Sequence, residues 1–298
     1  MTRTINPASV LDRLKHLRRT TYPNIPPNVM LLLYAQQGLL GRLQASSHAG
    51  HFVLKGALSL FARYREAARP TQDIDLAAAD LPNMPEAVEA VLRAVCGVPF
   101  GDGLVFDPDR VRTSVINEAL DYPGVTARLR ATLGASQVDL QLDVSFGNVI
   151  TPAPVTLAFP PLLLDEAVHM AVYPLETVIT EKFAALVEIG AATTRMKDVY
   201  DLYTILRRET FDAALVRTAI DRSFAARQTP RETVAEVLSK SFAEDEILSA
   251  RFEQYARRTG LSVPAWNEAM ALVRAFYGPL LLEGPSFGVW REGRWTLE

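Results

Sequence analysis

Two aspartates, Asp73 and Asp75, are the residues whose type and spacing point most directly to chemistry. They stand two positions apart in the run Asp73-Ile-Asp-Leu-Ala77, which is typical of a strand. Residues i and i+2 of a strand point to the same face, so the two carboxylates are expected side by side. Mg²⁺ binds one or two carboxylates and keeps positions for phosphate oxygens and water. An isolated Asp-x-Asp is more often a pair of surface aspartates at a strand end, and glycosyltransferases also use it.

A glycine lies upstream of this pair, at a predicted change from strand to helix. Residues 52–54 are apolar and predict a short strand, Lys55-Gly56-Ala57 follows, and residues 58–68 predict a helix. Backbone N–H groups at a helix start can receive a phosphate, and a glycine leaves them accessible. The turn and the aspartates together predict a triphosphate site with its metal ion.

A third carboxylate is expected from a strand further along the chain. The segment from Val138 to Val144 alternates strictly, with Asp139 and Asp143 on its polar face. Asp143 on a neighbouring strand would complete a two-metal site, in which the metals activate the attacking hydroxyl and stabilise the leaving pyrophosphate. Asp139 shares this face and is a rival, and both carboxylates pointing into water is the plain alternative.

Two predicted helices carry the remaining candidate residues. Lys182 can contact triphosphate oxygens as a point charge, or it can be an ordinary solvated lysine. In the run from Arg195 to Leu202, Asp198 and Asp201 stand three apart and share a helix face, whereas Lys197 and Asp201 stand four apart and can pair on the surface.

The elements that must position these residues fall into three parts. Residues 1–49 are predicted to be a helical segment packed on the core, with a break at the prolines of residues 22–27. Residues 50–164 mix helices with strands, the latter expected at 73–77, 103–106, 111–116, 125–133 and 138–146. Residues 165–298 are expected to be almost entirely helical, with breaks near Gly190, Pro230, 260–264 and 278–279. This order predicts an α+β fold, with an α+β domain followed by a helical one.

Composition and charge narrow the function classes. Apolar residues make up 49% of the 298 residues, and a single cysteine fits a reducing cytoplasm. The longest apolar region, residues 29–43, is too short and too polar to span a bilayer, so no membrane association is expected. The net charge is −3, but ten cations and two acids give residues 1–69 a charge of +8 and leave −11 on the rest. This asymmetry is compatible with docking of a polyanion or with solvated helix faces and internal salt bridges.

Four ordered blocks resemble the AbiEii/AbiGii-type nucleotidyltransferases, which are toxins of bacterial toxin–antitoxin systems with a polymerase-β-like core and an added helical domain. The blocks cover roughly residues 50–235. They are Phe52-Val-Leu-Lys-Gly-Ala57 with Arg69-Pro-Thr-Gln-Asp-Ile-Asp-Leu76, Asp143-Val-Ser-Phe-Gly147, Tyr173-Pro-Leu-Glu-Thr-Val-Ile-Thr-Glu-Lys-Phe-Ala-Ala185, and Arg195-Met-Lys-Asp-Val-Tyr-Asp-Leu202.

The resemblance implies a role for each matching residue. Asp73, Asp75 and Asp143 would hold one or two Mg²⁺ ions, and Asp201 would be the essential acid of the last block, acting as a base or organising the site. Thr71 matches a hydroxyl residue that the antitoxin phosphorylates in some relatives, where added negative charge would obstruct metal or nucleotide binding. Nucleotide contacts would come from Lys55, Gly56, Ala57, Lys182, Arg195, Lys197 and Asp198.

The resemblance also implies an activity, with a departure from the wider superfamily. Ala57 stands where that superfamily often has Ser or Gly after the turn glycine, so phosphate contact would rest on backbone N–H groups. The implied reaction transfers a nucleoside monophosphate from a triphosphate to an RNA, expected to be the 3′ end of tRNA, which blocks translation. The implied partners are the nucleoside triphosphate, RNA and a cognate antitoxin. The alternatives are a transferase of the same fold acting on a protein or a small metabolite, a phosphotransferase, and a binding module that has lost its chemistry.

Overall fold

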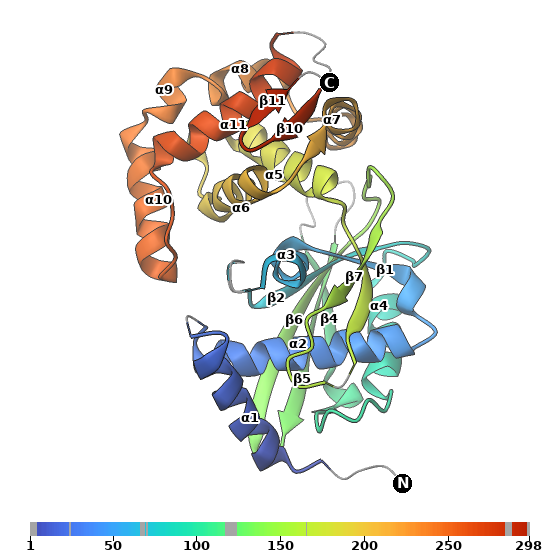
Figure 1. The fold of residues 1–298 in the computed structure, drawn as a ribbon. Coiled ribbons are helices and arrows are strands. Elements are labelled where there is room, and N and C mark those ends of the chain that lie inside the picture. The colour runs from blue at the N-terminus through green and yellow to red at the C-terminus, as the bar shows by residue number, and fades with distance from the viewer. Residues whose placement is uncertain are drawn as a thin grey trace. The chain divides into compact units, whose positions relative to one another are not determined.

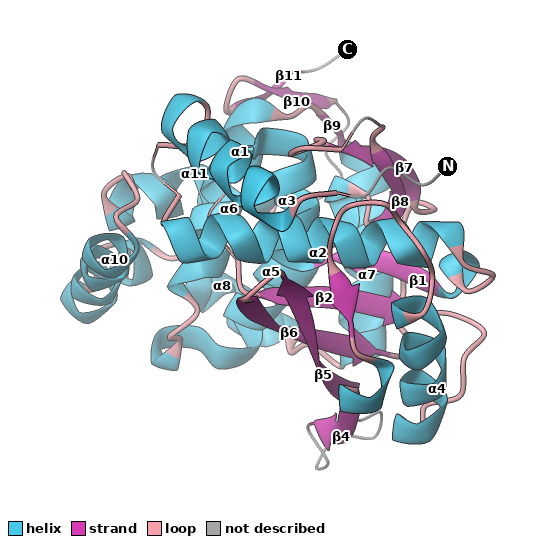
Figure 2. Cartoon of the chain, turned by 90° about the horizontal axis from the view of Figure 1, so that it is seen from below, coloured by secondary structure: helices cyan, strands magenta, loops and turns pink. Residues whose placement is uncertain are grey.

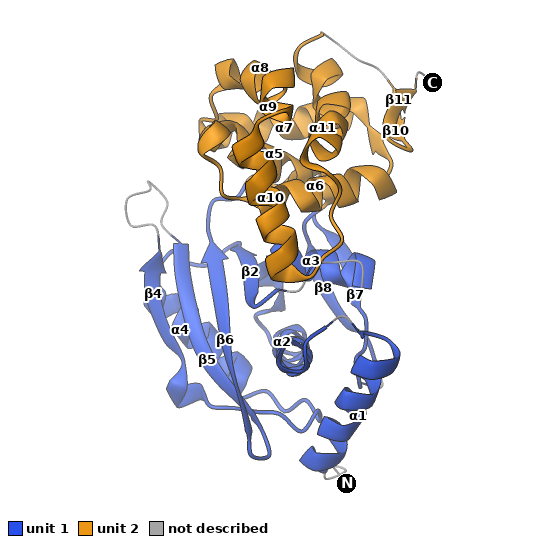
Figure 3. Ribbon diagram, turned by 90° about the vertical axis from the view of Figure 1, so that its left-hand side faces the viewer, with its two compact units in different colours: residues 1–148, 154–173 blue, residues 149–153, 174–298 orange. Residues whose placement is uncertain are grey.

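The chain folds into two compact units. The computed structural model describes residues 5–23, 25–65, 69, 71–116, 124–164, 166–283 and 288–296. Unit 1 comprises Met1–Asn148 and Pro154–Tyr173, and unit 2 comprises Val149–Ala153 and Pro174–Glu298 (Figure 3). The three-part division inferred from the sequence, with boundaries after residues 49 and 164, stays a prediction.

Unit 1 is built around a mixed sheet with the strand order β3-β5-β6-β2-β1-β8-β7, and β4 pairs with β5 (Figure 1). β2 pairs in parallel with β6 and antiparallel with β1, while β5 and β6 form a long antiparallel pair. The strands are β1 (Phe52–Lys55), β2 (Asp73–Ala78), β3 (Val105–Phe106), β4 (Arg112–Ile116), β5 (Gly124–Leu133), β6 (Ser136–Ser145), β7 (Val155–Phe159) and β8 (Val168–Val172).

Among the described residues, four α-helices complete this unit, and the long helix α2 lies across one face of the sheet (Figure 2). Val138, Leu140, Leu142 and Val144 of β6 are buried, which leaves the alternating polar positions of that strand on the other face. The sheet therefore has an apolar core face and a separate polar face. The helices are α1 (Pro7–Thr20), α2 (Pro27–Ala45), α3 (Gly56–Tyr64) and α4 (Pro85–Cys96).

Helix α2 is buried along nearly its whole length, and its polar residues find partners inside unit 1. Arg42 is 4% exposed, and its guanidinium donates to both carboxylate oxygens of Asp102 at 2.6 and 2.9 Å. The same group lies over the ring of Phe106 at 4.6 Å. One of the ten cations in the basic first part of the chain therefore serves an internal ion pair and is not available to a polyanion.

Unit 2 is mainly helical and carries a small sheet with the strand order β11-β10-β9. Its core contains stacked aromatic rings, with Phe183 and Tyr277 at 3.8 Å between ring centroids. Trp290 is 0% exposed and donates its indole N–H to the Leu206 carbonyl. The elements are α5 (Leu175–Ile189), α6 (Met196–Arg208), β9 (Phe211–Asp212), α7 (Ala213–Arg227), α8 (Val234–Val237), α9 (Lys240–Ala243), α10 (Glu246–Thr259), α11 (Trp266–Leu281), β10 (Val289–Arg291) and β11 (Arg294–Thr296).

The predicted α+β fold class is confirmed, with corrections to individual elements. The expectation of an almost entirely helical chain after residue 165 was wrong for β8 and for the small sheet, whose strands are too short to show a period. The break expected at residues 278–279 was also wrong, because α11 continues through both residues and ends at Leu281, with Pro279 in its last turn. The predicted helix over 58–68 begins at Gly56, and residues 66–68 lie outside the described residues. Among the described residues, no helix is long and apolar enough to cross a membrane.

Candidate active site

A row of polar side chains crosses the sheet of unit 1 at one level. Asp75 of β2 lies opposite Lys55 of β1 on one side and opposite Asp143 of β6 on the other. Asp143 lies opposite Thr126 of β5, which lies opposite Ser114 of β4. Residues directly opposite in neighbouring strands have side chains within contact distance on the same face. The strand register therefore brings two predicted acidic residues and a cation to one place.

Gly56 fits closely against Asp75 at the start of α3. Its φ is +65°, a conformation that L side chains rarely adopt. A Cβ built on Gly56 would lie 1.9 Å from Oδ2 of Asp75, so the carboxylate occupies the space that any side chain would need. The hydroxyl of Ser59 donates to the Gly56 carbonyl at 2.8 Å. Only glycine allows this approach of strand β2 to the helix start.

The Gly56→Ala variant is therefore expected to lose both stability and activity. The left-handed conformation costs a non-glycine residue about 1–3 kcal/mol, and the new methyl group must displace the Asp75 carboxylate. We expect a lower melting temperature and a loss of turnover larger than the loss of folded protein explains. Gly50→Ala is the matched control, since a Cβ there meets nothing within 4 Å. Equal behaviour of the two variants in thermal unfolding and turnover would contradict this account of the turn.

The structure separates the two rivals for the third carboxylate. Asp139 forms a bidentate pair with Arg130, at 2.5 and 3.0 Å, and this hydrogen bonding lowers the pKa of Asp139. Its side chain is 73% exposed, and its partner in the β5–β6 register is that same arginine. Asp143 lies opposite Asp75 instead and accepts a hydrogen bond of 2.6 Å from Thr126. Asp143 is thus beside the aspartate pair, and Asp139 is engaged elsewhere.

The donor chemistry fits a divalent cation held mainly by Asp73 and Asp75. Both lie on the polar face of β2, and carboxylates are the ligands that Mg²⁺ takes from proteins. Within the described part of the chain, no group of three or more His, Cys, Asp or Glu side chains is arranged to hold a metal ion. One oxygen of Asp143 already accepts a hydrogen bond from Thr126, so at most its second oxygen is available to such a site without a side-chain rotation. Two carboxylates suffice for one magnesium ion, because water and substrate phosphates supply the other ligands.

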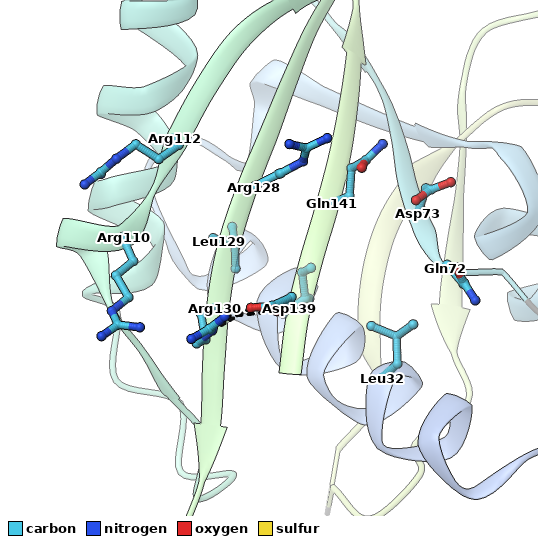
Figure 4. Close-up of a pocket in the computed structure, with 11 residues that line it drawn as sticks. Leu32, Gln72, Asp73, Arg110, Arg112, Arg128, Leu129, Arg130, Asp139 and Gln141 are labelled. Atoms are coloured by element: carbon cyan, nitrogen blue, oxygen red, sulfur yellow. Dashed lines mark hydrogen bonds and ion pairs between the residues drawn. The ribbon is translucent and has the colours of Figure 1, made fainter. Parts of the chain in front are cut away.

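A second polar row runs beside the first and ends at Asp73. Asp73 lies opposite Gln141 of β6, Gln141 opposite Arg128 of β5, and Arg128 opposite Arg112 of β4. These four residues line a groove of about 730 Å³ on the polar face of the sheet (Figure 4). Its lining includes four arginines and two aspartates, on a chain whose net charge is −3. Sequence reasoning missed these four arginines, although the alternation of Arg128 and Arg130 in β5 was a readable signal.

The remaining predicted residues of unit 1 lie near these rows. The ammonium of Lys55 lies 5.9 Å from the centre of the Tyr173 ring, and Ala57 is buried in the first turn of α3. Thr71 is 8% exposed, and its hydroxyl donates to the Asp73 carbonyl at 3.3 Å. Phosphorylation of Thr71 therefore requires its hydroxyl to leave this bond and become accessible.

In unit 2, the predicted residues of two helices form one ion cluster. The ammonium of Lys182 on α5 donates to Asp198 and to Asp201 of α6, each at 2.7 Å. Arg195 donates to the second oxygen of Asp198 at 2.5 Å. The side chains of Lys182, Asp198 and Asp201 are 11%, 5% and 3% exposed. The structure thus brings together residues that the sequence presented as two separate elements.

Lys197 does not take part in this cluster. It is exposed on α6, and it makes no ion pair with any residue that the structure describes. The surface pair between Lys197 and Asp201 that the helix spacing allowed is therefore not formed, because Asp201 turns toward Lys182.

The cluster predicts a specific loss of stability in acid. Burial opposes ionisation of Asp198, but Lys182 and Arg195 outweigh it and lower the pKa of its carboxyl to about 2. An unfolded aspartate has a pKa of about 3.9, so ionised Asp198 stabilises the fold above that pH. This contribution, roughly 2 kcal/mol, should disappear as pH falls from about 4 to about 2. Urea unfolding across this range should show a weaker pH dependence for Asp198→Asn, and identical pH dependences would contradict the assignment.

The similarity of this chain to known proteins covers residues of both units. The family model described as "Nucleotidyl transferase AbiEii toxin, Type IV TA system" matches residues 38–274, a range that contains every candidate residue above. A crystal structure of JHP933 from Helicobacter pylori is similar at 12% identity and a TM-score of 0.45, over 83% of this chain and 89% of that one. Another, described as a "putative nucleotidyltransferase from H. pylori", is similar at 13% identity and a TM-score of 0.49, over 87% and 97%. A search of curated proteins finds no match.

Proposed function

The chain belongs to the AbiEii family of nucleotidyltransferase toxins, and from this premise we propose that it transfers a nucleoside monophosphate from a nucleoside triphosphate to the 3′ end of an RNA. The expected acceptor is tRNA, and the expected consequence is a block of translation in the cytoplasm. Nucleotidyltransferases generally use a nucleoside triphosphate with a divalent metal ion, which we propose is Mg²⁺ here. The toxin family also implies an antitoxin as partner.

The observation that supports this reaction most strongly is the row across the sheet of unit 1. Asp75 lies between Lys55 and Asp143, and it contacts the glycine at the start of α3. A triphosphate can be received there by the backbone N–H groups of the helix start and by the cation of Lys55. Asp73 and Asp75 would hold the metal ion, which supplies neutralisation of the charge that develops on the phosphate oxygens.

The cluster in unit 2 supports a contribution to nucleotide binding by Lys182. Its ammonium is held between Asp198 and Asp201, so its position is fixed before any substrate arrives. We propose that Lys182 contacts the nucleotide and that the two carboxylates position it, assisted by Arg195 through Asp198. A low pKa keeps Asp198 ionised at neutral pH, which suits an electrostatic role. Because Asp201 accepts a hydrogen bond from the Lys182 ammonium, we propose it as a positioning residue and not as a base.

The reaction can be tested directly with labelled substrates. The purified chain would be incubated with Mg²⁺, total bacterial RNA and each of the four nucleoside triphosphates labelled at the α-phosphate. The expected result is label on a tRNA-sized band with a preferred nucleotide, and none when the divalent cation is chelated. Label on the protein itself or on small molecules, with none on RNA, would contradict the proposed acceptor. Absence of transfer to any acceptor would contradict the activity.

A further inference from the structure

The groove beside Asp73 has an excess of positive charge that the nucleotide site does not use. Arg128 lies exposed on β5, and its guanidinium makes no hydrogen bond or ion pair to any other described residue. Arg112 donates to the main-chain carbonyls of Asp109 and Val111, and its guanidinium makes no ion pair with a carboxylate of the described residues. In the same groove Arg130 is neutralised by Asp139. The groove thus contains two cations that are not neutralised by a described carboxylate.

Register places these cations on a straight path from the candidate metal site. Arg128 and Arg112 stand two and three strands away from Asp73 in one row. Neighbouring strands lie about 4.8 Å apart, so their backbones are roughly 10 and 14 Å from that of Asp73. Gln141 lies between Asp73 and Arg128 and adds a neutral hydrogen-bonding group to the path (Figure 4). A chain of phosphates could follow this row.

The in-line geometry of the reaction places the two anionic substrates, the triphosphate and the RNA, on opposite sides of the aspartate pair. Lys55 and the start of α3 lie on the β1 side of the aspartate pair, whereas the arginines lie on the β6 and β5 side. In phosphoryl-type transfer, the attacking and leaving oxygens are roughly in line on opposite sides of the phosphorus. With the pyrophosphate end of the nucleotide at the α3 side, the attacking hydroxyl must approach from the arginine side. The strand that carries this hydroxyl would then lie over the groove.

We propose that Arg128 and Arg112 bind the backbone phosphates of the RNA acceptor next to its 3′ end. This inference rests on the proposed function and adds which surface of the chain holds the acceptor. Arginine suits the task because its planar guanidinium forms bidentate, charge-assisted hydrogen bonds with phosphate oxygens. Such contacts fix the position of the strand without reading its sequence. The surface differs from the basic first part of the chain, where Arg42 is buried in an ion pair.

The inference can be tested by binding, without turnover. The probe is a single-stranded RNA of 12 nucleotides with a 5′ fluorescein and a free 3′ hydroxyl, titrated with the full chain by fluorescence anisotropy without nucleotide. We expect Arg128→Gln to raise the Kd about tenfold, and Arg112→Gln to act in the same direction. The double variant should also reduce the salt dependence of log Kd by about 1.4, the value for two single-strand phosphate contacts. Arg19→Gln removes the same charge at an exposed position of α1 and should leave the Kd within about twofold of the wild-type value.

Further measurements show whether the arginines bind RNA or the nucleoside triphosphate. They also separate a failure of this inference from a failure of the proposed RNA acceptor. Binding of a nucleoside triphosphate without RNA, measured by calorimetry, should be unchanged in Arg128→Gln. Loss of triphosphate binding with unchanged RNA binding would overturn the inference and assign the arginines to the nucleotide. Weaker RNA binding by Arg19→Gln alone would overturn it in favour of α1. If the wild type binds the RNA and all variants bind it with the same Kd, this inference is wrong but the proposed function stands. If the wild type does not bind the RNA, the proposed RNA acceptor is wrong as well.

Discussion

The Asp73→Asn variant is expected to lose about a thousandfold or more of nucleotidyl transfer while it remains folded. Asparagine keeps the size of the side chain but removes the charge that would hold a divalent cation. A bound metal supplies several kcal/mol of transition-state stabilisation, and each 1.36 kcal/mol is a factor of ten in rate. Asp73 is only partly buried at the start of β2, so the free energy of unfolding should change by less than about 1 kcal/mol.

Asp139→Asn is the matched control for this experiment. Asp139 lines the same groove, but it pairs with Arg130 and its side chain is 73% exposed. Its removal should change the transfer rate only a few-fold. Turnover and urea unfolding would be measured for both variants. Full activity of Asp73→Asn, or equal inactivity of the two, would show that the aspartate pair on β2 is not the metal-binding centre.

The Lys182→Ala variant is expected to be destabilised by about 3–5 kcal/mol. Lys182 donates to two carboxylates whose side chains are 5% and 3% exposed. Removing one partner of a buried ion pair leaves uncompensated buried charge, which costs more than the pair itself contributed. Here it would leave Asp198 and Asp201 facing each other across the space of the lost ammonium, while Arg195 still pairs with Asp198.

Lys197→Ala makes the appropriate comparison in urea unfolding. Lys197 is exposed on the same helix as the two aspartates and makes no ion pair with a described residue, so its loss should cost less than about 0.5 kcal/mol. Adding Asp201→Asn to Lys182→Ala should recover part of the lost stability, since one buried charge is then removed. If Lys182→Ala and Lys197→Ala unfold at the same urea concentration, the cluster does not stabilise unit 2 as described.

The sequence predicted which face of a strand each side chain occupies better than it predicted which strands pair with each other. Alternation from Val138 to Val144 was enough to place Asp143 on a polar face, because side-chain direction in a strand depends only on parity. It could not distinguish Asp143 from Asp139, because that choice depends on which residue lies opposite Asp75 across a parallel pair. Strand pairing is a long-range property, and local pattern does not encode it.

The same limit applied to the helices and to the basic groove. The spacing of Lys197 and Asp201 suggested a local pair, whereas Asp201 pairs with Lys182, 19 positions away on another helix. The charge of residues 1–69 gave no indication of Arg112 and Arg128, which come together only through the register of β4 and β5. Local periodicity therefore found most elements, and the tertiary pairing of charges decided which residues form the candidate site.

One comparison of labels tests the central claim most directly. Wild type and Asp73→Asn would each be incubated with RNA, Mg²⁺ and the preferred triphosphate, labelled either at the α-phosphate or at the γ-phosphate. We predict that α-label enters RNA, that γ-label is released as pyrophosphate, and that Asp73→Asn transfers neither. Entry of γ-label into any acceptor would identify a phosphotransferase, and undiminished α-labelling by Asp73→Asn would remove the aspartate pair from the reaction.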